Sequence, residues 1–295
     1  MSADRWLIML IPYFGKWPEW IDLFVESCKW NPSVCWRIYT DCGAPQNKAE
    51  NVEIVDFTLA DYKALVSDRL GIRFNPSDPY KLCDIRPALG YIHEQEIAEF
   101  RFFGFGDVDV VYGNIRKFYT DELLDQWDVL STHNERLSGH FAVLRNTPQL
   151  RRAFRRIPNH RALLERPEYV GIDETPFGSA LQRRNRLLNL VQRKPRTLFV
   201  ERYSTVLSGR GWHDGTMNYP LRWFWRKGEL TNDRDADRDF LYLHFMRWKS
   251  LRYLASSPAP GQGAWLNLDH LVHIDWPHAA THGFCISPAG FTPIN

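Results

Sequence analysis

Cysteine is scarce in this sequence, and the cysteines that are present do not form a recognisable site. The 295 residues contain five cysteines, an odd number, and no two of them form a C-x-x-C pair. The pattern therefore indicates neither a disulfide framework nor a zinc site built from paired thiols. We expect five reduced thiols in a protein of a reducing compartment.

Long apolar runs are also missing. The N-terminal residues lead into six apolar residues, Trp6 to Ile11, and Pro12 ends this run. Such a run is too short for the core of a signal peptide or for a membrane span, and no longer apolar run of spanning length follows it. We therefore expect a cytoplasmic protein, whose only membrane contact would be peripheral, at the inner face of the cell membrane.

An excess of charge of one sign is absent from the chain as a whole. Lys and Arg number 37 and Asp and Glu number 35, so binding to nucleic acid is not expected. Between Arg151 and Arg196, however, eleven Arg and one Lys accompany four acidic residues. Two interpretations stay open for this segment: solvated helix faces, or contact with an acidic membrane surface or a phosphate-bearing acceptor. The second would involve Arg151, Arg152, Arg155 and Arg156.

Several sequence motifs with known chemistry do not occur. The chain has no G-x-G-x-x-G, no G-x-x-x-x-G-K-[ST] and no G-x-S-x-G, so dinucleotide-binding, P-loop and serine-hydrolase functions have no support. It also has no internal repeat, no low-complexity tract and no clear linker. We expect one domain over residues 1–250, with residues 251–295 as a C-terminal extension packed on the same domain.

The apolar runs that are present predict an α/β fold. Trp6–Ile11, Val34–Thr40 and Val52–Phe57 are apolar without alternation, which is typical of strands buried on both faces of a parallel sheet. A helical pattern lies between the first and second strands and another follows the third, so we expect a mostly parallel, Rossmann-like sheet flanked by helices. An aromatic-rich, irregular C-terminal segment follows Gly209.

Other elements are expected on the same grounds. Thr58 and Thr147 are placed to cap helices, and Pro148 would occupy the first helical position. Further helices are expected after Pro79–Ala88 to about Glu99, and through Leu181 to Leu188. Further strands are expected over residues 127–132, 140–145, 197–200 and 204–207.

The most informative stretch runs from Phe102 to Gly113 and contains Asp107 and Asp109. In a strand, residues two apart point to the same face, so these two carboxylates would lie together on a largely apolar strand. Buried carboxylates need compensation, and Mg²⁺ or Mn²⁺ would provide it. The alternative is a tight turn that carries two solvated acids.

Three loops are expected beyond the carboxyl ends of the strands, where parallel sheets bind ligands. The third contains Asp107 and Asp109, and the second contains Asp41, which could accept a hydrogen bond from a nucleoside. The first loop supplies a lysine, a glycine and aromatic rings. Its candidate residues are Pro12, Tyr13, Phe14, Gly15 and Lys16. Together the loops predict a site for a nucleoside diphosphate and a metal ion.

Four motifs carry a resemblance to a known family. The segments IPYFGKWPEW, IYTDC, PYKLCDIRPALGY and FGFGDVDVVYGNIRKF resemble a family of bacterial glycosyltransferase-like proteins, known mainly as a domain of unknown function. These proteins look like GT-A nucleotide-sugar transferases. The resemblance covers residues 6 to 250 and implies a GT-A-like sheet, an NDP-sugar donor and Mn²⁺ or Mg²⁺.

The resemblance also implies roles for later residues. GT-A enzymes often add a late histidine to the metal site and a lysine on the diphosphate, which would be His244 and Lys249 here. This segment departs from the better-known H-F-x-G-x-x-K-P-W form, since the glycine is missing. The segment with Lys81 and Arg86 would touch the base and the phosphates, although a solvated helix start explains it equally well. The metal ligands would be Asp107, Asp109 and His244.

An inverting transferase needs a base for the acceptor hydroxyl, and Asp173 and Glu174 are the candidates, with Asp173 favoured. They could instead only stabilise a helix N-terminus. The sequence thus predicts transfer of a sugar from an NDP-sugar, which we expect to be a UDP-sugar, to a surface-glycan or lipid-linked acceptor. The alternatives are a sugar nucleotidyltransferase, a glycan- or nucleotide-binding protein without turnover, and transfer onto a modified nucleic-acid base.

Overall fold

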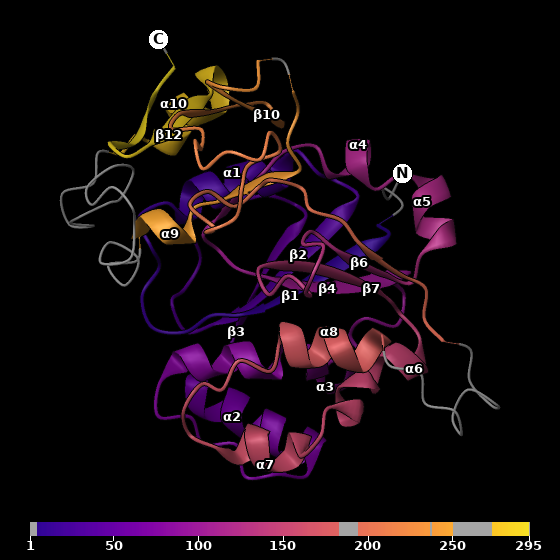
Figure 1. Cartoon of the computed structure of the whole chain (residues 1–295). Coiled ribbons are helices and arrows are strands. Elements are labelled where there is room, and N and C mark those ends of the chain that lie inside the picture. The colour runs from indigo at the N-terminus through magenta and orange to yellow at the C-terminus, as the bar shows by residue number, and fades with distance from the viewer. Residues whose placement is uncertain (1–4, 183–193, 237, 250–272, 295) are drawn as a thin grey trace.

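A seven-stranded mixed sheet lies at the centre of the computed structural model, which describes residues 5–182, 194–236, 238–249 and 273–294 (Figure 1). In spatial order its strands are β3 (Val52–Asp56), β2 (Val34–Thr40), β1 (Leu7–Pro12), β4 (Phe102–Gly106), β7 (Phe141–Arg145), β6 (Val129–Ser131) and β8 (Thr197–Phe199). All neighbouring pairs are parallel except those of β7, which runs antiparallel to β4 and β6. The expected α/β class with a mostly parallel sheet is confirmed.

The apolar run of β1 is continuous because both faces of the sheet are covered. Ile8 and Leu10 contribute to one buried cluster, while Leu7, Met9 and Ile11 contribute to another on the opposite face. Successive side chains of a strand point to opposite faces, so a strand between two layers of helices needs apolar residues at every position.

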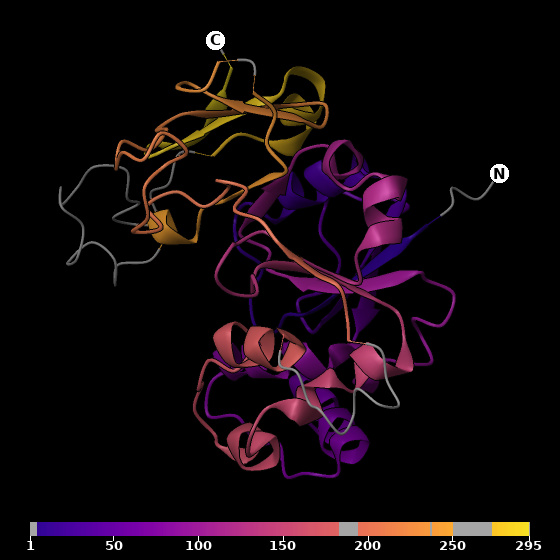
Figure 2. The ribbon, with the colours of Figure 1, turned by 45° about the vertical axis from the view of Figure 1, so that its right-hand side comes forward.

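Helices cover both faces of this sheet (Figures 1 and 2). One face is covered by α2 (Leu59–Leu70), η1 (Pro79–Ala88), α3 (Leu89–Ile92), α6 (Pro148–Arg151), η2 (Ala153–Arg156), α7 (His160–Glu165) and α8 (Thr175–Gln182). The other is covered by α1 (Ile21–Lys29), α4 (Ile115–Phe118) and α5 (Asp121–Gln126). The predicted caps are confirmed, since the hydroxyls of Thr58 and Thr147 accept the backbone N–H of Asp61 and Leu150.

A second, antiparallel sheet packs beyond α1 (Figure 2). Its strands, in order, are β10 (Glu229–Asn232), β9 (Trp223–Arg226), β12 (Phe284–Ser287) and β13 (Gly290–Pro293), and α10 (Trp276–His282) precedes β12. The aromatic-rich segment supplies its core, in which Trp223 and Trp225 are fully buried. Residues on both sides of position 250 thus share one sheet, and the division at 250 stays a prediction.

A two-stranded pair connects the two sheets to the loop of Asp107 and Asp109. β5 (Val110–Tyr112) pairs antiparallel with β11 (Tyr242–His244), and α9 (Met246–Lys249) follows β11. The pair brings a segment from late in the chain to the carboxyl end of β4.

Three predicted elements differ in the structure. The helix expected after Pro79–Ala88 to about Glu99 is only the short α3, which ends at Ile92, and turns follow it to residue 99. Residues 79–88, which precede it, form the 3-10 helix η1, where Pro87 lacks the N–H that a continuous α-helix would need. Residues 204–207 form no strand and contribute only an isolated bridge between Thr205 and His244. The helix through Leu181 is described only to Gln182, and Leu187 and Leu188 lie outside the described residues.

Within the described residues, no helix has the length and apolar character needed to cross a membrane.

Candidate active site

Asp107 and Asp109 do not lie on one strand, as the sequence predicted. β4 ends at Gly106 and β5 begins at Val110, so the two aspartates lie in the bend where the chain leaves the central sheet. Main-chain bonds hold this bend, since Asp107 N–H donates to the His140 carbonyl at 3.2 Å and the Asp109 carbonyl accepts from Phe245 N–H at 3.2 Å. The prediction failed because the apolar residues on both sides belong to different sheets.

The bend nevertheless brings both carboxylates together with His244. In the β5–β11 pair, His244 is the partner of Val110, and it therefore lies beside Asp109. One ligand atom from each of Asp107, Asp109 and His244 lies within 4.8 Å of the others. His244 Nε2 is 3.7 Å from Asp109 Oδ2, and both residues are only 3% exposed.

The chemistry of these three side chains fits a divalent cation. A buried carboxylate such as that of Asp109 is costly without positive charge nearby. Carboxylate oxygens are ligands for Mg²⁺ and Mn²⁺, and an imidazole nitrogen extends the choice to transition metals. Asp107, Asp109 and His244 could therefore hold one divalent ion.

The ring of His244 is held by a neighbouring loop. Thr205 Oγ1 lies 3.4 Å from His244 Nδ1, and the ring of His140 stacks on His244 with 3.8 Å between centroids. Burial, together with the neighbouring His244 and His133, lowers the pKa of His140 well below its usual value. Such contacts fix the orientation of an imidazole, and they leave Nε2 on the side of Asp109.

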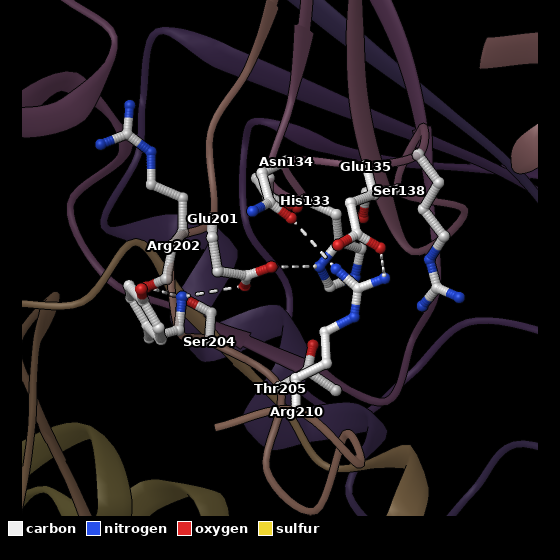
Figure 3. A network of polar contacts seen from close by, with 12 residues as sticks. His133, Asn134, Glu135, Ser138, Glu201, Arg202, Ser204, Thr205 and Arg210 are labelled. Carbon is white, nitrogen blue, oxygen red and sulfur yellow. Dashed lines mark hydrogen bonds and ion pairs between the residues drawn. The ribbon is translucent and has the colours of Figure 1, made fainter. Parts of the chain in front are cut away.

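Polar contacts tie this loop to the segment after β6 (Figure 3). The carboxylate of Glu201 meets His133 Nδ1 at 3.1 Å, and the guanidinium of Arg210 contacts Asn134 at 3.0 Å and Glu135 at 2.5 Å. Both ends of the segment that carries Thr205 are therefore fixed. Thr205 could not be predicted as part of the site, because nothing in its local sequence indicates a contact with a histidine 39 residues later.

A cavity of about 610 Å³ opens next to the two aspartates, at the carboxyl ends of β1 and β4. It brings together predicted site residues from the loop after β1, from η1 and from the bend after β4. Pro12, Tyr13, Phe14, Arg86, Asp107 and Asp109 line it. Tyr80 and Met246, which were not predicted from the sequence, also line it.

The loop after β1 is tied to the loop after β2. Gly15 N–H donates to Asp41 Oδ1 at 2.7 Å, and the ring of Tyr13 stacks on Trp17 with 5.1 Å between centroids. Gly15 has a φ of +110°, a conformation that favours glycine. Gly15, Lys16 and Asp41 are exposed and do not line the cavity, so their contact with a nucleotide stays a prediction.

The prediction for Lys81 is wrong. Its side chain is 0% exposed, and its ammonium pairs with Asp84 Oδ2 at 3.0 Å and donates to the Leu163 carbonyl at 2.8 Å. Asp84 in turn accepts the backbone N–H groups of Val170 and Ile172. Lys81 cannot reach a phosphate without breaking this buried pair, so its role is structural.

This pair yields a stability prediction. Lys81→Met should lower the free energy of unfolding by about 3–5 kcal/mol, because Asp84 would stay buried without its cation. The double variant Lys81→Met/Asp84→Asn should lose less, because no charge is then left unpaired. Urea denaturation of both variants measures this, and a loss below about 1 kcal/mol for the single variant would contradict it.

Arg86 connects the cluster of Asp107, Asp109 and His244 with the predicted base Asp173. Its Nη1 donates to Asp173 Oδ2 at 3.0 Å, and its Nη2 donates to Asp107 Oδ1. Asp173 is 1% exposed and also accepts from the Tyr169 hydroxyl at 3.2 Å. Burial raises the pKa of Asp173 to about 6, although Arg86 acts to lower it.

The other candidate base has a different environment. Glu174 pairs with Arg136 at 3.2 Å, and its side chain is about one-third exposed. Of the two acids, only Asp173 is linked to the cavity through Arg86. Lys249 is the last residue of α9, and its side chain lies outside the described part of the structure.

The model of the "Family of unknown function (DUF6625)" matches residues 9–269. A search of curated proteins gave no match.

Solved structures of similar shape include three glycosyltransferases. The galactosyltransferase LgtC, in complex with donor and acceptor sugar analogues, is 10% identical with a TM-score of 0.34, over 59% of this chain and 70% of LgtC. Mouse xyloside xylosyltransferase 1 is 9% identical with a TM-score of 0.37, over 82% and 97%. GlyE of Streptococcus pneumoniae TIGR4 is 8% identical with a TM-score of 0.33, over 66% and 45%.

Proposed function

The chain belongs to the family of unknown function DUF6625, and from its site we propose that it is a metal-dependent, GT-A-like glycosyltransferase. The donor would be an NDP-sugar, which we expect to be a UDP-sugar, and the acceptor a glycan or a lipid-linked sugar. One observation carries the proposal: the cluster of Asp107, Asp109 and His244 beside a cavity at the carboxyl ends of parallel strands.

The metal would be held by Asp107, Asp109 and His244. We expect Mn²⁺ rather than Mg²⁺, because Mg²⁺ prefers oxygen ligands alone. When bound, a divalent ion offsets the negative charge that develops on a departing nucleoside diphosphate. Thr205 and His140 would keep the imidazole of His244 in place for this ion.

The nucleoside would occupy the side of the cavity formed by the loop after β1. Tyr13 and Phe14 line this side, and the Tyr13 ring is already fixed by stacking on Trp17. Fixed aromatic rings present flat apolar surfaces on which a base can stack. Asp41 lies one residue beyond β2 and holds this loop through Gly15.

The acceptor would enter beside Asp173. Tyr80 and Tyr169 are 56% and 38% exposed, and their rings meet edge to face with 4.7 Å between centroids. Exposed aromatic rings next to a polar group suit the apolar face of a sugar. If transfer inverts the anomeric centre, Asp173 takes the proton of the acceptor hydroxyl, and a pKa of about 6 suits this role at neutral pH.

We also propose a cytoplasmic location for the protein. The Arg-rich segment between Arg151 and Arg196 would contact an acidic membrane surface. Arg152 and Arg155 are exposed, but both guanidiniums lie over the ring of Tyr91. Ring contacts of this kind do not remove the positive charge. An acidic surface could therefore still be attracted to this face.

Calorimetric titration tests the proposed donor site. UDP, GDP, ADP and CMP are titrated into the full chain with and without Mn²⁺. A nucleoside diphosphate should bind only in the presence of Mn²⁺, and UDP should bind most tightly. If none of the four binds in a metal-dependent way, the proposal is wrong.

A further inference from the structure

Arg86 contacts one of the carboxylates of the proposed metal site. Its guanidinium is shared between Asp107, a proposed metal ligand, and Asp173, the proposed base. The side chain is only 12% exposed and lines the cavity. Its single positive charge thus faces two carboxylates in a poorly hydrated place.

We propose that Arg86 is an internal counter-ion that a divalent cation displaces from Asp107. This inference rests on the proposed metal site of Asp107, Asp109 and His244. In the absence of metal, Arg86 compensates Asp107. Metal binding takes over that carboxylate, and Arg86 then remains paired with Asp173 alone.

The competition follows from the charges. Asp107 Oδ1 accepts from Arg86 Nη2, and a cation at the same carboxylate would be repelled by the guanidinium. Repulsion between charges is strongest where water is excluded, as it is around Asp109 and Asp173. Part of the binding energy of the metal is therefore spent on separating Arg86 from Asp107.

Arg86 remains tethered at its other nitrogen. Nη1 donates to Asp173 at 3.0 Å, and Gly139 lies against this pair so closely that a Cβ there would be 2.9 Å from Asp173 Oδ2 and 3.1 Å from Arg86 Nη1. Once Asp107 is taken by metal, Nη2 needs a new acceptor. An anionic group in the cavity, such as a diphosphate, would provide it. Metal should therefore bind before the diphosphate and favour its binding.

Two substitutions should change metal affinity in opposite directions. Arg86→Gln removes the competing cation, so Mn²⁺ should bind more tightly. Asp173→Asn removes the second carboxylate of Arg86. Among the described residues Asp107 is then the only carboxylate that pairs with Arg86, so Mn²⁺ should bind more weakly. In the double variant Arg86→Gln/Asp173→Asn, the change at position 173 should have no further effect on Mn²⁺ affinity, because that change acts through Arg86.

Mn²⁺ alone is the probe, and the free ion is counted by electron paramagnetic resonance at fixed pH and ionic strength. Arg86→Gln should bind Mn²⁺ about tenfold more tightly than the wild-type chain, which corresponds to about 1.4 kcal/mol. Asp173→Asn should bind a few-fold more weakly, and the double variant should match Arg86→Gln. Arg136→Gln is the matched control, since Arg136 pairs with Glu174 next to the site, and its affinity should be unchanged.

The outcomes separate this inference from the proposed function. If the wild-type chain binds Mn²⁺ and both Arg86→Gln and the double variant bind it equally or more weakly, Arg86 does not compete and the inference is wrong. If the wild-type chain does not bind Mn²⁺, the proposed metal site itself is wrong. Arg86→Gln alone leaves the buried charge of Asp173 unpaired and could lose binding by unfolding. The double variant has no unpaired charge at position 173, so it separates loss of binding from loss of the fold, and a thermal melt checks that it is folded.

Discussion

Replacing Asp109 by Asn is expected to lower metal-dependent turnover by about 10³-fold or more while leaving the fold intact. Asp109 is the more buried of the two aspartates and lies beside His244, so its charge is the part of the cluster least exposed to water. The amide removes that charge but keeps the size of the side chain. The main-chain bond from Phe245 to the Asp109 carbonyl does not depend on the side chain.

Turnover of an NDP-sugar at saturating Mn²⁺ measures this loss, and circular dichroism with a thermal melt checks the fold. Asp121→Asn is a suitable control, because Asp121 is a surface carboxylate that pairs with Arg116 away from the site. The control should keep wild-type activity. An Asp109→Asn variant that retains a tenth or more of the metal-dependent rate would undo the assignment of Asp109 as a ligand.

Replacing Asp173 by Asn should lower kcat by about 10²–10⁴-fold, the usual contribution of a general base. In the wild-type enzyme kcat should rise with pH and level off above about 6, because burial raises the pKa of Asp173 to about 6 and only the ionised carboxylate accepts a proton. Arg86→Gln should move this acidic limb to higher pH, since Arg86 acts to lower that pKa.

Glu174→Gln provides the comparison for Asp173→Asn. Glu174 pairs with Arg136 and is more exposed, so its loss should cost less than about tenfold in kcat. If instead Asp173→Asn keeps nearly wild-type kcat under saturating donor, Asp173 is not the base. Such a result would point to a retaining reaction that does not need one.

The strands could be predicted because their signal is local. A strand such as β1, covered on both faces, needs apolar residues at every position, and this pattern is visible in the sequence. The helix caps at Thr58 and Thr147 are equally local. The bend at Asp107 was not predictable in this way, because the strands before and after it belong to different sheets.

The site was predicted only in part for a similar reason. The resemblance brought together Asp107, Asp109 and His244, and the structure places them in one cluster. The prediction that Lys81 contacts a phosphate was wrong, because the burial of Lys81 depends on Asp84 and on a carbonyl 82 residues away. Arg86 was predicted as a phosphate ligand, and its contacts with Asp107 and Asp173 become visible only when distant segments meet.

The identity of the reaction products tests the central claim most directly. The full chain is incubated with a UDP-sugar, a sugar acceptor and Mn²⁺, and nucleotide products are separated by chromatography. The proposed transferase predicts release of UDP in equal amount to the transferred sugar, and no release without the metal. Pyrophosphate formation from UTP and a sugar phosphate would instead identify a nucleotidyltransferase. Metal-dependent binding of UDP without any product, over a panel of UDP-sugars and acceptors, would contradict catalysis and leave a binding protein.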